Sequence, residues 1–291
     1  MVNSVAFICG FSALLISTLA GAEPRVVTEI EFARVGERSL KLDLYLPDAE
    51  VKNPPLIVYV HGGAWRAGSR DKVPVRVLVD AGFAIASVDY RLSPEAVFPA
   101  QVHDIKAAIR FLRKNADAHG YDPKRIAIAG SSAGGHLAAL VGVTNGHSVL
   151  EGDVGEHGDQ SSDVQAIVSF YGASNLTTIL SQSTPHGLSV RVPALELLLG
   201  GAPEEKSSLA ELASPVFHVD AKDPPLFLIH GDQDPQMPVN QSLELVGAYE
   251  KAGASVRLEI VHGGTHGGEG FYTADQLAEV AAFLRSSFHD R

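Results

Sequence analysis

The chain has 291 residues, of which 45% are hydrophobic and 20% are charged, and this composition indicates a globular protein with one large domain or two small ones. Its formal net charge of -11 disfavours a nucleic acid or an anionic membrane as a partner, because the phosphate field would repel an acidic surface. The sequence shows no repeat of fixed period and no low-complexity tract.

Residues 1–22 are predicted to be a signal peptide. Residues 5–20 are apolar and uncharged, and residues 20–22 offer an A-x-A cleavage site, although the segment lacks the usual Lys or Arg. An uncleaved anchor is the alternative, but this apolar run is shorter than the ~20 residues that a spanning helix needs. We therefore expect a secreted or periplasmic mature chain over residues 23–291, with no stable membrane insertion. The only cysteine, Cys9, precedes the cleavage site, which excludes disulfides and thiol chemistry from the mature chain.

Strand-like and helix-like patterns alternate along the rest of the chain. Residues 26–35 and 40–47 alternate apolar and polar side chains, as in strands with one solvated face. Continuous apolar runs, typical of strands covered on both faces, occupy residues 55–63, 83–91, 125–131, 164–172, 225–232 and 256–263. Helical patterns occupy residues 100–120, the segment after Ser132, residues 241–254 and residues 274–288. This order predicts an α/β fold with a doubly wound, mostly parallel eight-stranded sheet and helices on both faces.

Residues 145–214 interrupt the alternation, since they contain a single strand-like run. Residues 145–163 are polar, acidic and Gly-rich, which predicts a mobile surface loop. Residues 176–201 look like an insertion, with a short helix expected at 193–200. Such an insertion either forms a lid or substrate wall, or is an excursion without a role in the site.

A serine lies at the turn between a predicted strand and a predicted helix. Residues 130–134 read Gly-Ser-Ser-Ala-Gly and fit the pattern G-x-S-x-G, in which glycines relieve the crowding of a sharp turn. The central Ser132 would project above the sheet at the N-terminus of a helix, whose free N–H groups stabilise a developing oxyanion. Ser132 is therefore the candidate nucleophile, and Ser131 is expected to face the scaffold. The alternative is that small residues serve packing alone at this junction.

A Gly-rich segment follows the strand-like run at residues 55–60. Here the backbone N–H groups of Gly63 and Ala64 can join that of Ala133 in an oxyanion hole. A tight turn with a buried His61 is the alternative. Trp65, the only tryptophan, is interpreted as a substrate-binding wall of the site, with a purely apolar structural role as the alternative.

Acidic residues and histidines follow the last two predicted strands. Asp232 and Asp234 come after one strand, and His262 and His266 come after the next. A carboxylate at such a position can orient a histidine and stabilise its cation. The chain order Ser, Asp, His is the one expected for an α/β hydrolase, and His266 on a Gly-rich loop suits the role of base better than His262 at the strand end.

Two further charged residues, Asp89 and Arg91, follow the strand-like run at residues 83–88. We interpret them as a buried Asp–Arg network that steadies the loops, and Asp104 in the following helix is a candidate third member. A catalytic role for this group is the less favoured alternative.

These motifs together resemble the α/β-hydrolase superfamily of esterases and lipases. Residues 61–71, 129–140 and 262–273 are similar to the exported carbohydrate esterases that include bifunctional acetyl-xylan and feruloyl esterases, and hormone-sensitive-lipase-like esterases share some of these motifs. The family pattern selects Asp234 over Asp232 as the acid and His266 over His262 as the base. The resemblance therefore implies a catalytic triad of Ser132, Asp234 and His266.

The resemblance implies a serine carboxylic ester hydrolase that removes acetyl or feruloyl groups from a small or polysaccharide ester through an acyl-enzyme, without metal or cofactor. A generic short-chain carboxylesterase, an aryl-formamidase and a serine peptidase are alternatives on the same fold. A non-catalytic carbohydrate-binding protein is the alternative from another class. The sequence indicates neither the acyl group nor the oligomeric state.

Overall fold

The computed structural model describes residues 25–289, so the predicted signal peptide and Cys9 lie outside the described residues. Eight strands form one sheet: β1 (Arg25–Val35), β2 (Arg38–Leu46), β3 (Leu56–Val60), β4 (Ala84–Val88), β5 (Ile126–Ser131), β6 (Ala166–Phe170), β7 (Leu226–Gly231) and β8 (Val256–Val261). The helices are α1 (Ala100–Lys114), α2 (Ala116–His119), α3 (Ala133–Gly142), α4 (Ser148–Glu151), α5 (Ile179–Gln182), α6 (Pro185–Leu199), α7 (Ser207–Leu212), α8 (Asn240–Ala252) and α9 (Ala274–His289), with three short 3₁₀ turns, η1 (Arg76–Val79), η2 (Pro215–Phe217) and η3 (Glu269–Phe271). Every predicted strand and every predicted helical segment overlaps one of these elements.

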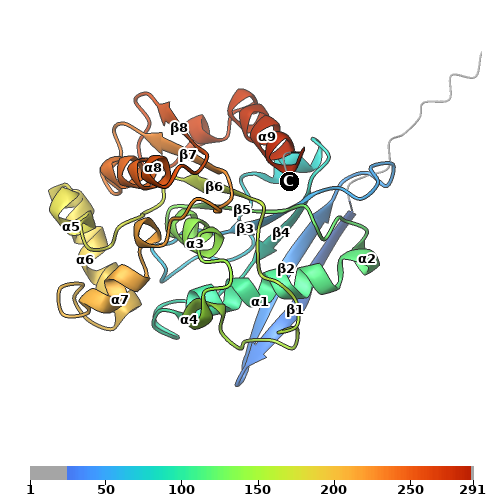
Figure 1. Ribbon diagram of the computed structural model, residues 1–291, viewed down its shortest axis with the longest axis horizontal. Coiled ribbons are helices and arrows are strands. Elements are labelled where there is room, and N and C mark those ends of the chain that lie inside the picture. Colours follow the sequence, from blue (N-terminus) through green and yellow to red (C-terminus); the bar gives the residue numbers. More distant parts are fainter. Residues whose placement is uncertain (1–24, 290–291) are drawn as a thin grey trace, which may run out of the picture.

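The strands lie in the order β1-β2-β4-β3-β5-β6-β7-β8 (Figure 1). The β1–β2 and β2–β4 pairs are antiparallel, and all pairs from β4 to β8 are parallel. The prediction of a mostly parallel, doubly wound sheet is therefore confirmed. Because the parallel strands run in the same direction, the loops after β3, β5, β7 and β8 emerge at one edge, where ligands of such sheets bind.

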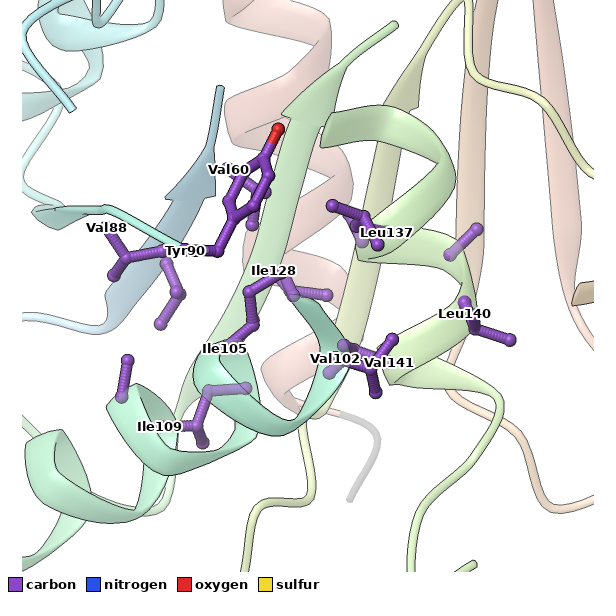
Figure 2. Close-up of a cluster of buried hydrophobic side chains, with 14 of the residues drawn as sticks. Val60, Val88, Tyr90, Val102, Ile105, Ile109, Ile128, Leu137, Leu140 and Val141 are labelled. Atoms are coloured by element: carbon purple, nitrogen blue, oxygen red, sulfur yellow. The ribbon is translucent and has the colours of Figure 1, made fainter. Parts of the chain in front are cut away.

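Successive residues of each central strand face opposite sides of the sheet and enter two separate cores. In β3, Val58 and Val60 pack with α1 and α3, whereas Ile57 and Tyr59 pack with η1 and α9. Figure 2 shows the first of these cores, where side chains of α1 and α3 meet those of the central strands. Burial on both faces explains why the central strands are continuously apolar in sequence.

Strand β2 differs from the expectation of one solvated face, since residues 42–46 are all buried. Its polar residue Asp43 is buried because it accepts a hydrogen bond from the backbone N–H of Glu29 and pairs with Arg70 at 3.0 Å. Arg70 also pairs with Asp89 at 2.6 Å. Arg91 instead pairs with Asp104, at 2.7 Å. The predicted network thus consists of two separate ion-pair clusters, and Arg70 is the partner of Asp89.

The segment 145–214 contains β6 and the four helices α4 to α7, of which α5, α6 and α7 lie together to one side of α3 (Figure 1). Helix α6 begins eight residues before the expected helix, because Thr184 caps it by accepting from the N–H of Gly187 at 3.0 Å and Pro185 occupies its first position. It ends at Leu199, and the following Gly200 has a left-handed φ of 70°.

The polar stretch 145–163 is anchored to α1 by charged side chains. Lys106 bonds Glu151 at 2.5 Å and the carbonyl of Thr144 at 2.6 Å, and Arg110 bonds Glu151 at 3.2 Å. Ser162 donates a further hydrogen bond to Glu151. Within residues 25–289, no helix is long and apolar enough to cross a membrane.

Candidate active site

Ser132 lies at the sharp turn between β5 and α3, with φ 54° and ψ -118°. A positive φ is unfavourable for a serine and is kept only where the surroundings hold it. The neighbouring glycines make the turn possible: a Cβ on Gly134 would lie 2.0 Å from the carbonyl oxygen of Val60, and one on Gly130 would lie 2.3 Å from that of Gly134. The G-x-S-x-G pattern therefore reflects close backbone contact between β3, β5 and α3.

Three residues from three strand ends form one hydrogen-bonded chain. Ser132 Oγ lies 2.8 Å from Nε2 of His266, and Nδ1 of His266 lies 2.7 Å from Oδ2 of Asp234. Asp234 follows β7 and His266 follows β8, as the sequence predicted. The structure therefore brings together the three residues that the family pattern selects. Asp232 and His262 instead pair with each other, at 3.0 Å.

Asp234 forms the buried end of this chain. Its Oδ1 accepts hydrogen bonds from the backbone N–H groups of Gln236 and Met237, each 2.8 Å long. Burial alone would raise the pKa of this carboxyl, but the imidazoles of His230 and His266 and the N–H of Met237 outweigh burial and hold the pKa below its ordinary value. An ionised carboxylate only accepts, so His266 donates from Nδ1 and its Nε2 is free to accept from the Ser132 hydroxyl.

Ser132 and His266 open into a cavity of about 900 Å³. Gly63 and Ala64 line the same cavity, where both have positive φ, 114° and 51°. Ala133 is the first residue of α3, so its N–H has no acceptor within the helix. The three backbone groups expected to bind an oxyanion thus come from the loop and the helix end that border Ser132.

Three tyrosines, Tyr59, Tyr171 and Tyr272, line the cavity beside the serine and the histidine. The Tyr59 hydroxyl hydrogen-bonds Ser131 Oγ, and the Tyr171 hydroxyl lies 2.7 Å from that of Tyr272. The ring of Tyr171 meets His266 edge to face, with centroids 5.0 Å apart. Burial raises the pKa of both Tyr171 and Tyr272, so their hydroxyls stay protonated. Ser131 contacts this scaffold as predicted and also lines the cavity.

The interpretation of Trp65 as a wall of the substrate site is wrong. Its side chain is fully buried, with 0% exposure, and it does not line the cavity. With φ 59°, Trp65 turns under the loop, where its Nε1 donates to Nδ1 of His136 at 3.0 Å. Nε2 of His136 in turn lies 2.7 Å from the carbonyl oxygen of Ala213. Trp65 therefore ties the Gly-rich loop to α3 and to the end of α7.

Arg191 of α6 lines the cavity and was missed by the sequence reasoning. Its side chain is buried, with 1% exposure for the residue, and Nε donates to the carbonyl oxygen of Gln236 at 3.2 Å. The available signal was a lone arginine between Val190 and Val192 in a mostly apolar helix. Because Gln236 N–H also binds Asp234, Arg191 connects the segment 145–214 to the loop that holds the carboxylate.

In this doubly wound sheet, a strained serine at a strand–helix turn is hydrogen-bonded to a histidine, and that histidine is hydrogen-bonded to an aspartate. The histidine and the aspartate follow later strands, and this arrangement defines an α/β hydrolase. The comparisons with known proteins agree. The family model BD-FAE matches residues 42–249. The chain therefore belongs to the BD-FAE family, and the proteins that it is similar to include named esterases.

The chain is 33% identical to a truncated carbohydrate esterase from gut microbiota, with a TM-score of 0.80 over 91% of this chain and 96% of that one. The acetyl ester-xyloside bifunctional hydrolase of Caldicellulosiruptor lactoaceticus is 26% identical, with a TM-score of 0.73 over 89% of this chain and 96% of that one. Esterase LipQ of Mycobacterium tuberculosis is 32% identical over 76% of this chain and 52% of LipQ. The chain spans about half the length of LipQ and of other curated relatives that it matches.

Proposed function

We propose that this protein is a serine ester hydrolase that removes acetyl groups from carbohydrate esters through an acyl-enzyme. The hydrogen-bonded chain of Ser132, His266 and Asp234, which opens into the cavity, carries this proposal. Ser132 Oγ attacks the ester carbonyl while Nε2 of His266 takes its proton, and ionised Asp234 keeps His266 in the required tautomer and stabilises its cation. His266 then gives the proton to the leaving alcohol, and a water molecule cleaves the acyl-enzyme in the same manner.

The backbone N–H groups of Gly63, Ala64 and Ala133 are the proposed oxyanion hole. Each such donor typically contributes ~3 kcal/mol to the stabilisation of the transition state. Two observations support the assignment: Gly63 and Ala64 line the cavity with positive φ, and Ala133 is the first residue of α3, so its N–H has no acceptor within the helix. Backbone strain of this kind is concentrated at functional sites.

The carbohydrate part of the proposal is supported by the solved structures that the chain is similar to. One is described as a carbohydrate esterase and another as an acetyl ester-xyloside hydrolase, and each is covered over 96% of its length. The cavity of about 900 Å³ is large enough for one or more sugar units, since pockets for small molecules typically occupy about 300–1,000 Å³.

The test is acetate release from acetylated xylan, with 4-nitrophenyl acetate as a small neutral ester. We expect the wild type to release acetate from xylan and the Ser132→Ala variant to lose activity on both substrates by a factor of about 10⁴ or more. Hydrolysis of the small ester without acetate release from xylan would leave an esterase but reject the xylan substrate. Full activity of Ser132→Ala on either ester would overturn the proposed nucleophile.

A further inference from the structure

Arg191 is a buried cation that forms no ion pair within the described part of the chain. Among residues 25–289 it has no ion pair with a carboxylate, and its Nη1 is buried without any hydrogen-bond partner. Its one side-chain hydrogen bond runs from Nε to the carbonyl of Gln236, and its guanidinium lies 5.8 Å from the centroid of the Trp65 ring. The guanidinium thus contacts the Trp65 ring, while its Nη1 makes no hydrogen bond.

A charge in this position is strongly unfavourable in a folded protein unless a partner compensates it. Burial lowers the pKa of Arg191 to about 10, with Asp234 opposing the change and Arg66 adding a smaller lowering effect, so the side chain still carries a positive charge near neutral pH. The stacking on Trp65 supplies only a modest attraction when compared with a carboxylate. Such a group at a cavity wall is therefore set up to meet a ligand.

The side chains that line the cavity carry a net positive charge, in contrast to the chain. Arg66, Lys72 and Arg191 line it, and the described residues at its wall include no Asp or Glu. The full chain has a net charge of -11, so an accumulation of cations at this one place is not a consequence of composition. A low-dielectric cleft lined by one sign of charge attracts ligands of the opposite sign.

We propose that Arg191 binds a carboxylate of the substrate, so that the preferred substrate is the ester of an acidic sugar, such as an acetylated uronic acid. The inference rests on the proposed function, because the same cavity holds the ester at Ser132. The flat fork of a guanidinium matches the two oxygens of a carboxylate, and the hydrogen bonds formed are charge-assisted. A carboxylate on the acyl group is the other possible source of the same chemistry.

A purely structural role for Arg191 has a different signature. Arg191 holds the carbonyl of Gln236, whose N–H holds Asp234, so loss of a mere tether would slow the hydrolysis of every ester by the same factor. Recognition of a carboxylate changes the ratio between charged and neutral substrates instead. The selectivity ratio is therefore the decisive quantity.

The experiment compares kcat/KM for two matched pairs of esters. The first pair is an acetylated methyl glucuronoside and the corresponding acetylated methyl glucoside, which differ only in the carboxylate. The second pair is 4-nitrophenyl hemisuccinate and 4-nitrophenyl butyrate, which place the carboxylate on the acyl group. We expect the wild type to prefer the glucuronoside, and Arg191→Gln to lower that preference by about 10- to 100-fold, mainly through KM. Arg191→Lys, which keeps the charge and loses the fork, is expected to lie between them.

The matched control is Arg76→Gln, because Arg76 is exposed and packs over Tyr45, away from the cavity wall. We expect it to leave both ratios unchanged. If Arg191→Gln does not fold, we measure competitive inhibition of the wild type by the two glycosides instead. The inhibition constant of methyl glucuronoside should be at least about 10-fold lower than that of methyl glucoside.

The outcomes separate the two proposals. A preference for hemisuccinate in place of the glucuronoside would keep carboxylate binding and move its source to the acyl group. Equal kcat/KM for charged and neutral esters in both pairs, equal inhibition by the two glycosides, or an equal loss on all esters in Arg191→Gln would overturn the inference while the esterase stands. Absence of activity on every ester, including 4-nitrophenyl acetate, would overturn the proposed function itself.

Discussion

Two His–Asp pairs lie on the same two loops of this protein. The two histidines are four residues apart in the loop after β8, and the two aspartates are two residues apart in the loop after β7. His266 Nδ1 lies 2.7 Å from Asp234, and His262 Nδ1 lies 3.0 Å from Asp232, so the pairs have nearly the same geometry. Their environments differ: the side chain of His266 is 11% exposed and that of His262 is 87% exposed. His266 alone places its second ring nitrogen against a serine hydroxyl.

The difference shows that pairing with a carboxylate does not by itself make a histidine a base for catalysis. Asp234 is buried and held by two backbone N–H groups, so His266 cannot exchange this partner for water. Asp232 and His262 form a solvated surface pair, whose interaction is screened and weak. Burial and the third group, the serine, are therefore what distinguishes the two pairs.

The largest expected effect is on the histidines. We expect His266→Ala to lower kcat/KM for 4-nitrophenyl acetate by about 10⁴- to 10⁶-fold, because the attacking hydroxyl loses its proton acceptor. His262→Ala is the matched control and should stay within about threefold of the wild type. Steady-state kinetics of the three proteins checks this, and a comparable loss in both variants would mean that the exposed pair also takes part in the reaction.

The carboxylates should repeat this contrast on a smaller scale. Asp234→Asn is expected to lower kcat by about 10⁴-fold, because an amide that donates to Nδ1 would leave His266 in the wrong tautomer. Asp232→Asn should have close to wild-type kcat, since its partner is exposed. The same assay distinguishes them, and a mild Asp234→Asn phenotype would reject its proposed role.

A third histidine, His136, extends the contrast to complete burial. Burial lowers its pKa to about 4, from an ordinary value of 6.5, while the hydrogen bond to the carbonyl of Ala213 opposes the shift. In addition, Trp65 donates to its Nδ1, so a proton on that nitrogen would place two donors against each other. His136 is therefore neutral in the folded protein over the pH range in which an unfolded histidine becomes charged.

The smallest expected effect follows from this shift. Between pH 6.5 and 4 the unfolded chain binds a proton at His136 that the folded chain does not, so stability falls as the pH falls through this range, by about 3 kcal/mol at most. We expect His136→Gln to be less stable at pH 7 and to show a correspondingly flatter pH dependence of the unfolding free energy. Urea unfolding at a series of pH values measures both slopes, and parallel curves for the two proteins would contradict the assignment.

Much of the fold and the three central residues of the site follow from local patterns. Continuous apolar runs predict the central strands, because these are covered on both faces of the sheet, and the G-x-S-x-G turn predicts Ser132, because only small neighbours permit the contact with β3. Parallel strands bring their carboxyl ends to one edge, so Asp234 and His266 at the ends of β7 and β8 could be placed beside Ser132.

What the sequence by itself determined is thus the order of elements and the residues at the strand ends, since both depend on short-range periodicity and on chain direction. Only the tertiary structure decided where the side chains of the loops and of the segment 145–214 point. Trp65 turns inward because His136, 71 residues away, accepts its N–H, and Arg191 reaches the cavity because α6 packs beside the loop of Gln236. These directions depend on partners far along the chain, which a local pattern does not contain.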